Sequence, residues 1–283
     1  MTVTPTSDHS LAASATSWLF VPGHRPDLFS KGVSSGADML VLDLEDGVPS
    51  DAKPAARAAV GDWLSGGHTA TVRVNAADTA WLADDVLALA GLPGLEAVVL
   101  AKAEEVDAVD RLRDELGVPV VLLVETAKGV ARVRDLAQAR GAARLALGAV
   151  DLTLDLGTSQ DEENLMLARL ELVLASRLGG LAKPLDSVPM GFVDIDAIKA
   201  SSQTSRRAGF GGRLCIHPAQ VAPVNASYLP DEKELAWARA VMANASEAGP
   251  TQLEGSMIDR PVVERARRVI ASVDPPSAHR DAR

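Results

Sequence analysis

Short apolar runs recur along the whole chain, and each one contains or leads into a charged or hydrogen-bonding residue. The runs are residues 18–21, 39–42, 71–74, 97–100, 118–124, 145–147, 181–185 and 214–216. Short apolar runs that alternate with helical stretches predict a parallel sheet. An open, doubly wound sheet would place a glycine-rich phosphate loop after its first strand, and Pro22-Gly23-His24-Arg25-Pro26 is not such a loop. The eight runs therefore favour a (β/α)8 TIM barrel, an α/β fold whose active site lies at the carboxyl ends of its strands.

The stretches between the runs carry apolar residues at helical spacing. We expect helices at 81–89, 106–116, 165–178 and 195–208, the last with Asp194 as its N-cap. Residues 221–230 show no clear period, and further helices are expected at 231–246 and 262–273. The predicted organisation is a disordered leader (1–16), a barrel (17–226), a small C-terminal helical lid (227–273) and a disordered tail (274–283). The lid is too short for a core of its own, so we expect it to pack on the barrel or on a neighbouring subunit.

Composition narrows the class of partner. The formal net charge of −10 argues against nucleic acid or an anionic membrane, while a local basic pocket could still bind an anionic small molecule. No uninterrupted apolar run reaches about 18 residues, and the first residues lack the features of a secretory signal, so a cytoplasmic location is predicted. Cys215 is the one cysteine of the sequence and lies in an apolar run, which indicates a buried, inert thiol.

Two carboxylates, Glu125 and Asp151, lie 26 residues apart at or just past the ends of consecutive predicted strands. Neighbouring strands of a barrel would bring them together, and two carboxylates without a nearby His or Cys suit a hard cation such as Mg2+, with Mn2+ as an alternative. Each could instead be a favourable charge at a helix N-terminus. The pairing at adjacent strand ends favours the metal.

Arg73 lies inside an apolar strand, where a guanidinium needs a partner. It could form an internal ion pair with acidic residues of the rim, or bind a carboxylate or a developing oxyanion. The acidic segment Asp43-Leu44-Glu45-Asp46-Gly47 could orient Arg73, Lys102 or a metal-bound water.

Lys102 could form a Schiff base, although a charge-pairing role is favoured. His217 could be a base or a structural residue, and Asp259 would by default be a surface helix cap.

Six segments in order make the chain resemble a known family. They are Leu19-Phe20-Val21-Pro22-Gly23, Leu42-Asp43-Leu44-Glu45-Asp46-Gly47-Val48, Val72-Arg73-Val74-Asn75, Val124-Glu125-Thr126-Ala127-Lys128-Gly129, Cys215-Ile216-His217-Pro218-Ala219-Gln220 and Gly255-Ser256-Met257-Ile258-Asp259. Together they resemble the citrate lyase beta-subunit-like family of the HpcH/HpaI aldolase superfamily, a group that also holds malyl-CoA and citramalyl-CoA lyases. The resemblance extends over residues 18–273.

The resemblance implies a Mg2+-dependent TIM barrel that makes or breaks a carbon–carbon bond between an acyl-CoA enolate and a 2-oxo acid. Glu125 and Asp151 match the metal ligands, and the 2-oxo acid would chelate the metal beside them. Arg73 matches the arginine that stabilises the substrate oxygen, and Glu45 an acidic residue that supports it. Asp259 matches an acid/base that the lid delivers from a neighbouring subunit, usually in a trimer.

The other implied contacts concern the CoA phosphates, for which His24, Arg25 and Lys31 are candidates. The chain departs from the family pattern at Val150, where an acidic residue usually precedes the metal aspartate, and at Leu100-Ala101-Lys102, where proline is usual in the middle. Loss of an outer carboxylate could loosen metal binding or change the oxo acid.

The predicted function is cleavage or formation of a 3-hydroxyacyl-CoA, such as malyl-CoA or citramalyl-CoA, through its acetyl-CoA and 2-oxo acid halves. Alternatives are the citryl-acyl-carrier-protein lyase subunit of a citrate lyase complex, a malyl-CoA thioesterase, a non-catalytic binding protein and a CoA-independent aldolase. Removal of Arg73 or Asp259 should lower turnover by orders of magnitude without unfolding the protein. Unfolding of an Arg73→Ala protein would instead indicate the internal ion pair.

Overall fold

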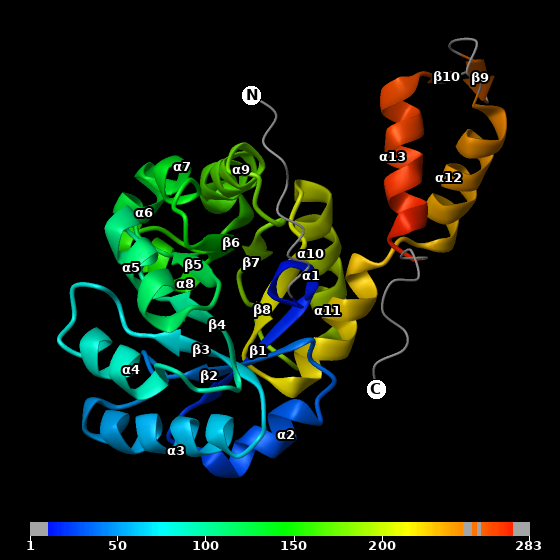
Figure 1. Cartoon of the computed structure of the whole chain (residues 1–283). Coiled ribbons are helices and arrows are strands. Elements are labelled where there is room, and N and C mark those ends of the chain that lie inside the picture. Colours follow the sequence, from blue (N-terminus) through cyan, green and yellow to red (C-terminus); the bar gives the residue numbers. More distant parts are fainter. Residues whose placement is uncertain (1–10, 246–250, 254–255, 274–283) are drawn as a thin grey trace. The chain divides into compact units, whose positions relative to one another are not determined.

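The computed structural model describes residues 11–245, 251–253 and 256–273, and the chain divides after Tyr228 into two compact units (Figure 1). Most of the expected leader and all of the expected tail, residues 1–10 and 274–283, lie outside the described residues. No described helix is both long and apolar enough to cross a membrane.

In the first unit, eight parallel strands of the described chain pair in sequence order, and β8 pairs with β1 to close the barrel. This confirms the predicted (β/α)8 fold. The apolar runs form strands because both faces of each strand are covered, as in β5, where every residue is buried. The strands are β1 (Ser17–Pro22), β2 (Met39–Asp43), β3 (Ala70–Val74), β4 (Leu95–Leu100), β5 (Val120–Val124), β6 (Ala142–Leu147), β7 (Leu185–Asp186) and β8 (Gly212–Cys215).

Helices follow the strands and cover the outside of the barrel (Figure 1). They are α2 (Phe29–Val33), α3 (Lys53–Ser65), α4 (Leu82–Leu89), α5 (Val106–Leu116), α6 (Ala127–Ala131), α7 (Val133–Leu136), α8 (Ala149–Leu156), α9 (Glu162–Leu178), α10 (Ile195–Ala208) and α11 (Val221–Tyr228). The expected helices at 81–89, 106–116, 165–178 and 195–208 are confirmed by α4, α5, α9 and α10 within a few residues. Asp194 caps α10 as predicted, because its side chain accepts a hydrogen bond from the Ala197 N–H.

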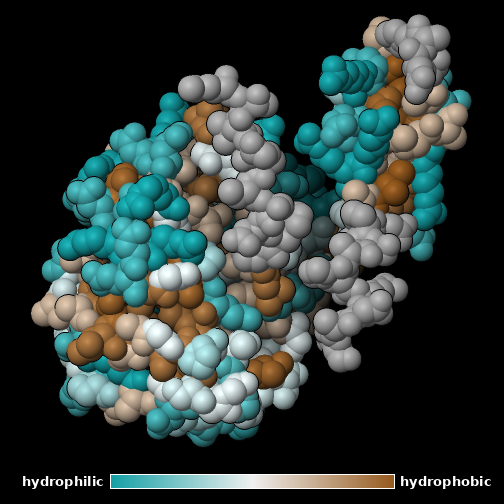
Figure 2. Space-filling view, in the orientation of Figure 1, coloured by the Kyte–Doolittle hydropathy of each residue, from teal (hydrophilic) through white to brown (hydrophobic). Residues whose placement is uncertain are grey.

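The apolar core has two layers. Side chains that point into the barrel, among them Trp18, Met39, Val41, Leu123 and Leu214, fill its interior. A larger cluster fills the space between the strands and the helices. Because the interior is packed, a substrate can only be held at a rim of the barrel. On the face shown in Figure 2, hydrophobic residues lie among hydrophilic ones, and α8 exposes Leu154.

Three segments differ from the sequence-based expectation. The run at 181–185 yields only the two-residue strand β7, since Pro184 has no N–H for a ladder and restricts the residue before it. Residues 221–228 form α11, although Pro223 interrupts a simple apolar period. The last part of the expected leader is ordered: α1 (Leu11–Ser14) lies against the barrel, where the buried Arg144 donates to the carbonyls of Ala12 and Ala15.

The number of paired residues differs between neighbouring strands of the barrel. β6 and β7 share one register pair, Ala146 with Leu185, and β7 and β8 share two. Side chains add bonds at this point: Arg213 donates to the Ser187 carbonyl, and the Ser187 hydroxyl accepts from the Ala149 N–H.

The second unit has its own small architecture. Helices α12 (Glu232–Asn244) and α13 (Arg260–Ala271) pack on each other, and between them in sequence lies an antiparallel pair, β9 (Thr251–Leu253) and β10 (Ser256–Ile258). Ala238, Val241, Ile258, Ala266 and Val269 form an apolar cluster within this unit. The expected helices at 231–246 and 262–273 are thus present, together with a small core that their length had argued against.

Candidate functional site

A cavity of about 290 Å3 opens at the carboxyl ends of the barrel strands. Polar residues at or just beyond the carboxyl ends of five different strands line it, and these are Asp43, Arg73, Glu125, Asp151 and Ser187. The structure therefore brings together three of the site residues expected from the sequence, Arg73, Glu125 and Asp151. Glu45, the fourth, joins them through an ion pair with Arg73.

Glu125 follows directly after β5 and is 1% exposed. Its Oε1 accepts a hydrogen bond of 2.9 Å from the Lys102 N–H. Burial, with the nearby charge of Asp151, raises the pKa of Glu125 to about 8. A carboxylate in this position gains from a bound cation, because a cation offsets both its lost hydration and the repulsion by Asp151.

Asp151 reaches the same cavity from the first turn of α8, so it is also a favourable charge at a helix N-terminus. Glu125, by contrast, does not cap the helix that follows it. The cap of that helix, α6, is Thr126, whose Oγ1 accepts a hydrogen bond from the Gly129 N–H at 3.0 Å.

The pair of carboxylates fits a divalent cation of the Mg2+ type. Gly148 leaves room for Glu125, since a Cβ at position 148 would lie 2.4 Å from its Oε2. Among the described residues no cluster of three or more His, Cys, Asp or Glu side chains is placed to hold a metal. Mg2+ keeps several waters and binds through one or two carboxylates, so two protein ligands with open positions for water and substrate suit it.

Arg73 is anchored by acidic residues of the segment after β2. Its Nε and Nη2 donate to the two carboxylate oxygens of Asp43 at 2.6 and 2.7 Å, and its Nη1 lies 3.0 Å from Glu45. Burial lowers the pKa of Arg73, but the hydrogen bonds and charge of Asp43 outweigh burial and hold the pKa above its ordinary value. The structure thus shows the internal ion pair that the sequence left open, with the same guanidinium lining the cavity.

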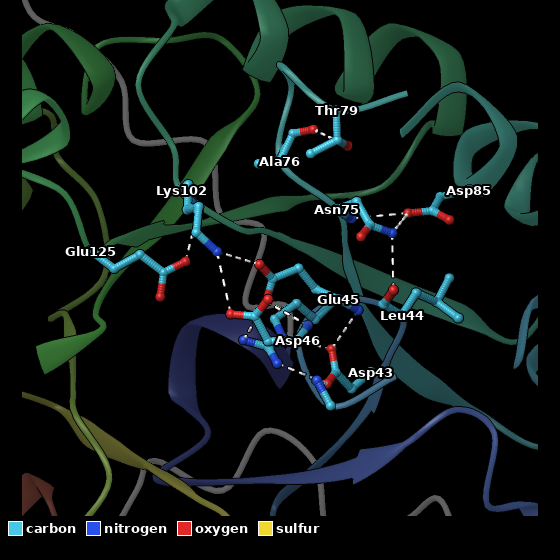
Figure 3. A network of polar contacts seen from close by, with 12 residues as sticks. Asp43, Leu44, Glu45, Asp46, Asn75, Ala76, Thr79, Asp85, Lys102 and Glu125 are labelled. Carbon is cyan, nitrogen blue, oxygen red and sulfur yellow. Dashed lines mark hydrogen bonds and ion pairs between the residues drawn. The ribbon is translucent and has the colours of Figure 1, made fainter. Parts of the chain in front are cut away.

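Lys102 links the two acidic groups of the rim (Figure 3). Its N–H binds Glu125, while its Nζ binds Glu45 and lies 3.4 Å from Asp46. Its φ of 46° is in the left-handed region, which a side-chain-bearing residue rarely adopts. Although burial lowers the pKa of the ammonium, the bond and charge of Glu45 raise it overall. Charge pairing is confirmed, and an ammonium held protonated is a poor Schiff-base nucleophile.

A buried network supports the acidic segment from behind, and sequence reasoning missed it. Lys53 donates to the carbonyls of Leu44 and Glu45 and to Asn75 Oδ1. Asn75 in turn donates to Asp85 at 2.6 Å (Figure 3). A lysine just before a proline at a helix start gives no sign of burial, whereas Asn75 at the end of a strand was a usable signal.

The remaining expected residues lie elsewhere. Arg25 pairs with Asp27 at 2.7 Å on the surface, Lys31 is exposed on α2, and neither lines the cavity. His217 accepts from the Ala219 N–H and stacks on Phe192, which is a structural role. Asp259 lies in the second unit, where its Oδ1 caps α13 by accepting from the Val262 N–H at 3.2 Å.

A closed (β/α)8 barrel with two carboxylates and an anchored arginine at its carboxyl rim is typical of barrel enzymes, whose active sites lie at that rim. Residues 16–218 match the family described as HpcH/HpaI aldolase/citrate lyase. The chain belongs to this family of carbon–carbon lyases.

Individual relatives span nearly the whole chain. A citrate lyase subunit beta-like protein of Mycobacterium tuberculosis is 37% identical over 270 residues, which cover 92% of this chain and 96% of the relative. A (3S)-malyl-CoA thioesterase of Cereibacter sphaeroides is 31% identical, with 93% and 95% covered. The structure of the protein CitE from Mycobacterium tuberculosis in complex with magnesium, acetoacetate and coenzyme A is similar with a TM-score of 0.83 and 35% identity, covering 93% of this chain and 99% of that one.

Proposed function

We propose that this chain is a Mg2+-dependent lyase that cleaves, or in reverse forms, a 3-hydroxyacyl-CoA such as malyl-CoA or citramalyl-CoA. The products are acetyl-CoA and a 2-oxo acid. The observation that carries the proposal is the convergence of Glu125, Asp151 and Arg73 on one cavity at the strand ends. A similar protein with magnesium, acetoacetate and coenzyme A bound supports the choice of ligands.

The reaction breaks the bond between C2 and C3 of the thioester. The 3-hydroxyl loses its proton and becomes the carbonyl of the 2-oxo acid. The bonding pair passes to C2 as the enolate of acetyl-CoA, which then takes up one proton. Negative charge therefore develops first on the 3-oxygen and then on the thioester half.

The residues of the cavity match the first of these charges. Glu125 and Asp151 would hold the metal, which when bound stabilises negative charge on the oxygens of the oxo acid. Arg73 would donate a hydrogen bond to the 3-oxygen. A guanidinium has five N–H groups, and Asp43 and Glu45 engage only one on each nitrogen, so donors remain for a substrate. The same two carboxylates hold Arg73 in place before the substrate arrives.

For the second charge we propose Asp259 as the group that gives the proton to C2. Its carboxyl is partly exposed, and one oxygen accepts the capping bond from Val262. We propose that the second unit of a neighbouring subunit supplies it, within a homo-oligomer such as a trimer. Arg25 and Lys31 stay proposed contacts for the CoA phosphates, and the Asp27 pair of Arg25 would then have to open.

Hydrolysis of the thioester is a second candidate, favoured by the similarity to a (3S)-malyl-CoA thioesterase. It differs from the lyase in its products, which would be free CoA and an intact hydroxy acid. A carrier-protein-bound citryl thioester is a further alternative, in keeping with the citrate lyase subunit beta-like relative.

One assay separates these functions. Purified full-length protein with Mg2+ is given malyl-CoA, citramalyl-CoA or citryl-CoA, and acetyl-CoA, 2-oxo acid and free CoA are measured together. We expect equal release of acetyl-CoA and 2-oxo acid, abolished by EDTA and by Glu125→Gln, and retained in Glu163→Gln, an exposed position on α9. Free CoA without a 2-oxo acid would establish hydrolysis, and no product from any thioester would contradict the proposal.

A further inference from the structure

Apart from its polar groups, the cavity has apolar walls. Phe20, Leu123, Val150, Val188, Leu214 and Ile216 line it. Val150 directly precedes Asp151 and is 49% exposed, and Ile216 follows β8 and is 60% exposed. Both side chains thus present apolar surface to any ligand held beside the carboxylates.

The charged residues that line the cavity disfavour a ligand with two carboxylates. Among the described residues that line the cavity, Arg73 is the single cation, and Asp43 and Glu45 already neutralise it. The other charged residues there, Glu125 and Asp151, would be balanced by one bound divalent cation. The carboxylate of a 2-oxo acid, held at the metal, then adds one negative charge.

A second carboxylate on the ligand would have to lie against apolar walls or beside acidic groups. An unpaired charge in such a place is disfavoured, since it loses part of its hydration without gaining a partner. A small alkyl group in the same place buries apolar surface and is favoured.

From these walls and charges we propose that the cavity selects a 2-oxo monocarboxylate with a small apolar substituent, with pyruvate preferred, and that Val150 and Ile216 are specificity-determining residues. The proposal rests on the proposed function, which puts a 2-oxo acid in this cavity. In the cleavage direction the corresponding substrate is a thioester that carries a hydroxyl, a methyl and a carboxylate on C3. An extra methyl in an apolar pocket favours pyruvate over glyoxylate by about 10-fold. An uncompensated carboxylate beside these half-exposed walls disfavours oxaloacetate by on the order of 10-fold or more.

Calorimetric titration of the full-length protein with pyruvate, glyoxylate and oxaloacetate, each with Mg2+ present, tests this without relying on turnover. Val150→Arg places a cation in the wall at a half-exposed position, where folding should tolerate it. Leu154→Arg is the matched control, because Leu154 lies on the same helix, is 79% exposed and is not part of the cavity lining.

We expect affinity to fall from pyruvate to glyoxylate to oxaloacetate. We also expect Val150→Arg to raise the affinity for oxaloacetate relative to pyruvate at least about 10-fold, while Leu154→Arg leaves the ratio unchanged. Oxaloacetate binding as tight as pyruvate, or equal shifts in both variants, would overturn the proposal. Absence of binding by all three acids would overturn it as well. The thioester assay on the same preparation then shows whether the lyase function has failed too.

Discussion

Gly148 is the position where the smallest change to the chain should have the largest effect on the proposed metal site. In Gly148→Ala the added Cβ would lie 2.4 Å from Glu125 Oε2 and 2.6 Å from Glu125 Cβ. Ordinary contact begins at 3.4 Å. The Cβ of Glu125 cannot swing away by a change of rotamer, because it is fixed to the backbone at the end of β5.

Glu125 must therefore shift by about 1 Å, and a displacement of that size at a reacting centre costs about 100-fold in rate. The backbone of Gly148 adds no penalty, since its φ of −100° suits an alanine. Overpacking of this kind lowers the free energy of unfolding by about 1 to 3 kcal/mol, which leaves most single domains folded.

The assay combines calorimetric Mg2+ titration, turnover of the cleaved thioester and thermal unfolding. We expect Gly148→Ala to bind Mg2+ at least about 10-fold more weakly and to lose turnover about 100-fold. Gly61→Ala is the control, because a Cβ there would meet nothing within 4 Å, and it should keep both properties. Normal Mg2+ affinity and turnover in Gly148→Ala would refute the placement of the metal at Glu125.

Three further predictions concern single residues. Arg73→Ala should lower the free energy of unfolding by about 3 to 5 kcal/mol, measured by urea denaturation, because it leaves buried Asp43 and Glu45 without their partner. A stable Arg73→Ala protein would show that the ion pair contributes little. Asp259→Asn should reduce turnover about 100- to 10,000-fold while the melting temperature is unchanged, since asparagine caps a helix as well as aspartate. Asp259→Ala should in addition lose about 1 kcal/mol of stability, and full activity of the Asn variant would remove Asp259 from the mechanism. Burial raises the pKa of Cys215 to about 12 from an ordinary value of 9.0, so its contribution to stability is complete below pH 9 and is lost as the pH rises towards 12. Labelling by a disulfide reagent near neutral pH should accordingly require unfolding, and rapid labelling of the native protein would contradict this burial.

The sequence predicted the parts of the fold that depend on local pattern. Apolar runs with polar ends located all eight strands, because burial on both faces removes polar residues from the strand interior. The apolar run at 181–185 predicted a longer strand than β7, because Pro184 lies inside the run. The helix α11 was not predicted, because Pro223 lies within its first turn.

The candidate site was predictable where a residue type by itself calls for a partner. A guanidinium in strand β3 and a carboxylate after β5 each indicated a polar environment. Which partner each of these groups binds could not be predicted from the sequence, because the pairing depends on loop geometry. The left-handed backbone of Lys102, which points its N–H at one carboxylate and its Nζ at another, has no counterpart in residue type.

The sparse pairing of β7 bears on how the barrel moves. One register pair joins β7 to β6 and two join it to β8, so local opening of the wall should need less free energy here than at the longer ladders. Asp151 lies in the first turn of α8, which follows β6, and Ser187 follows β7; both residues line the cavity. Local opening beside β7 should therefore displace Asp151 and Ser187 more readily than Arg73 in β3 or Glu125 after β5. The two proposed metal ligands thus differ in their support, because Glu125 follows a strand with long ladders while Asp151 lies beside the shortest ladder of the barrel.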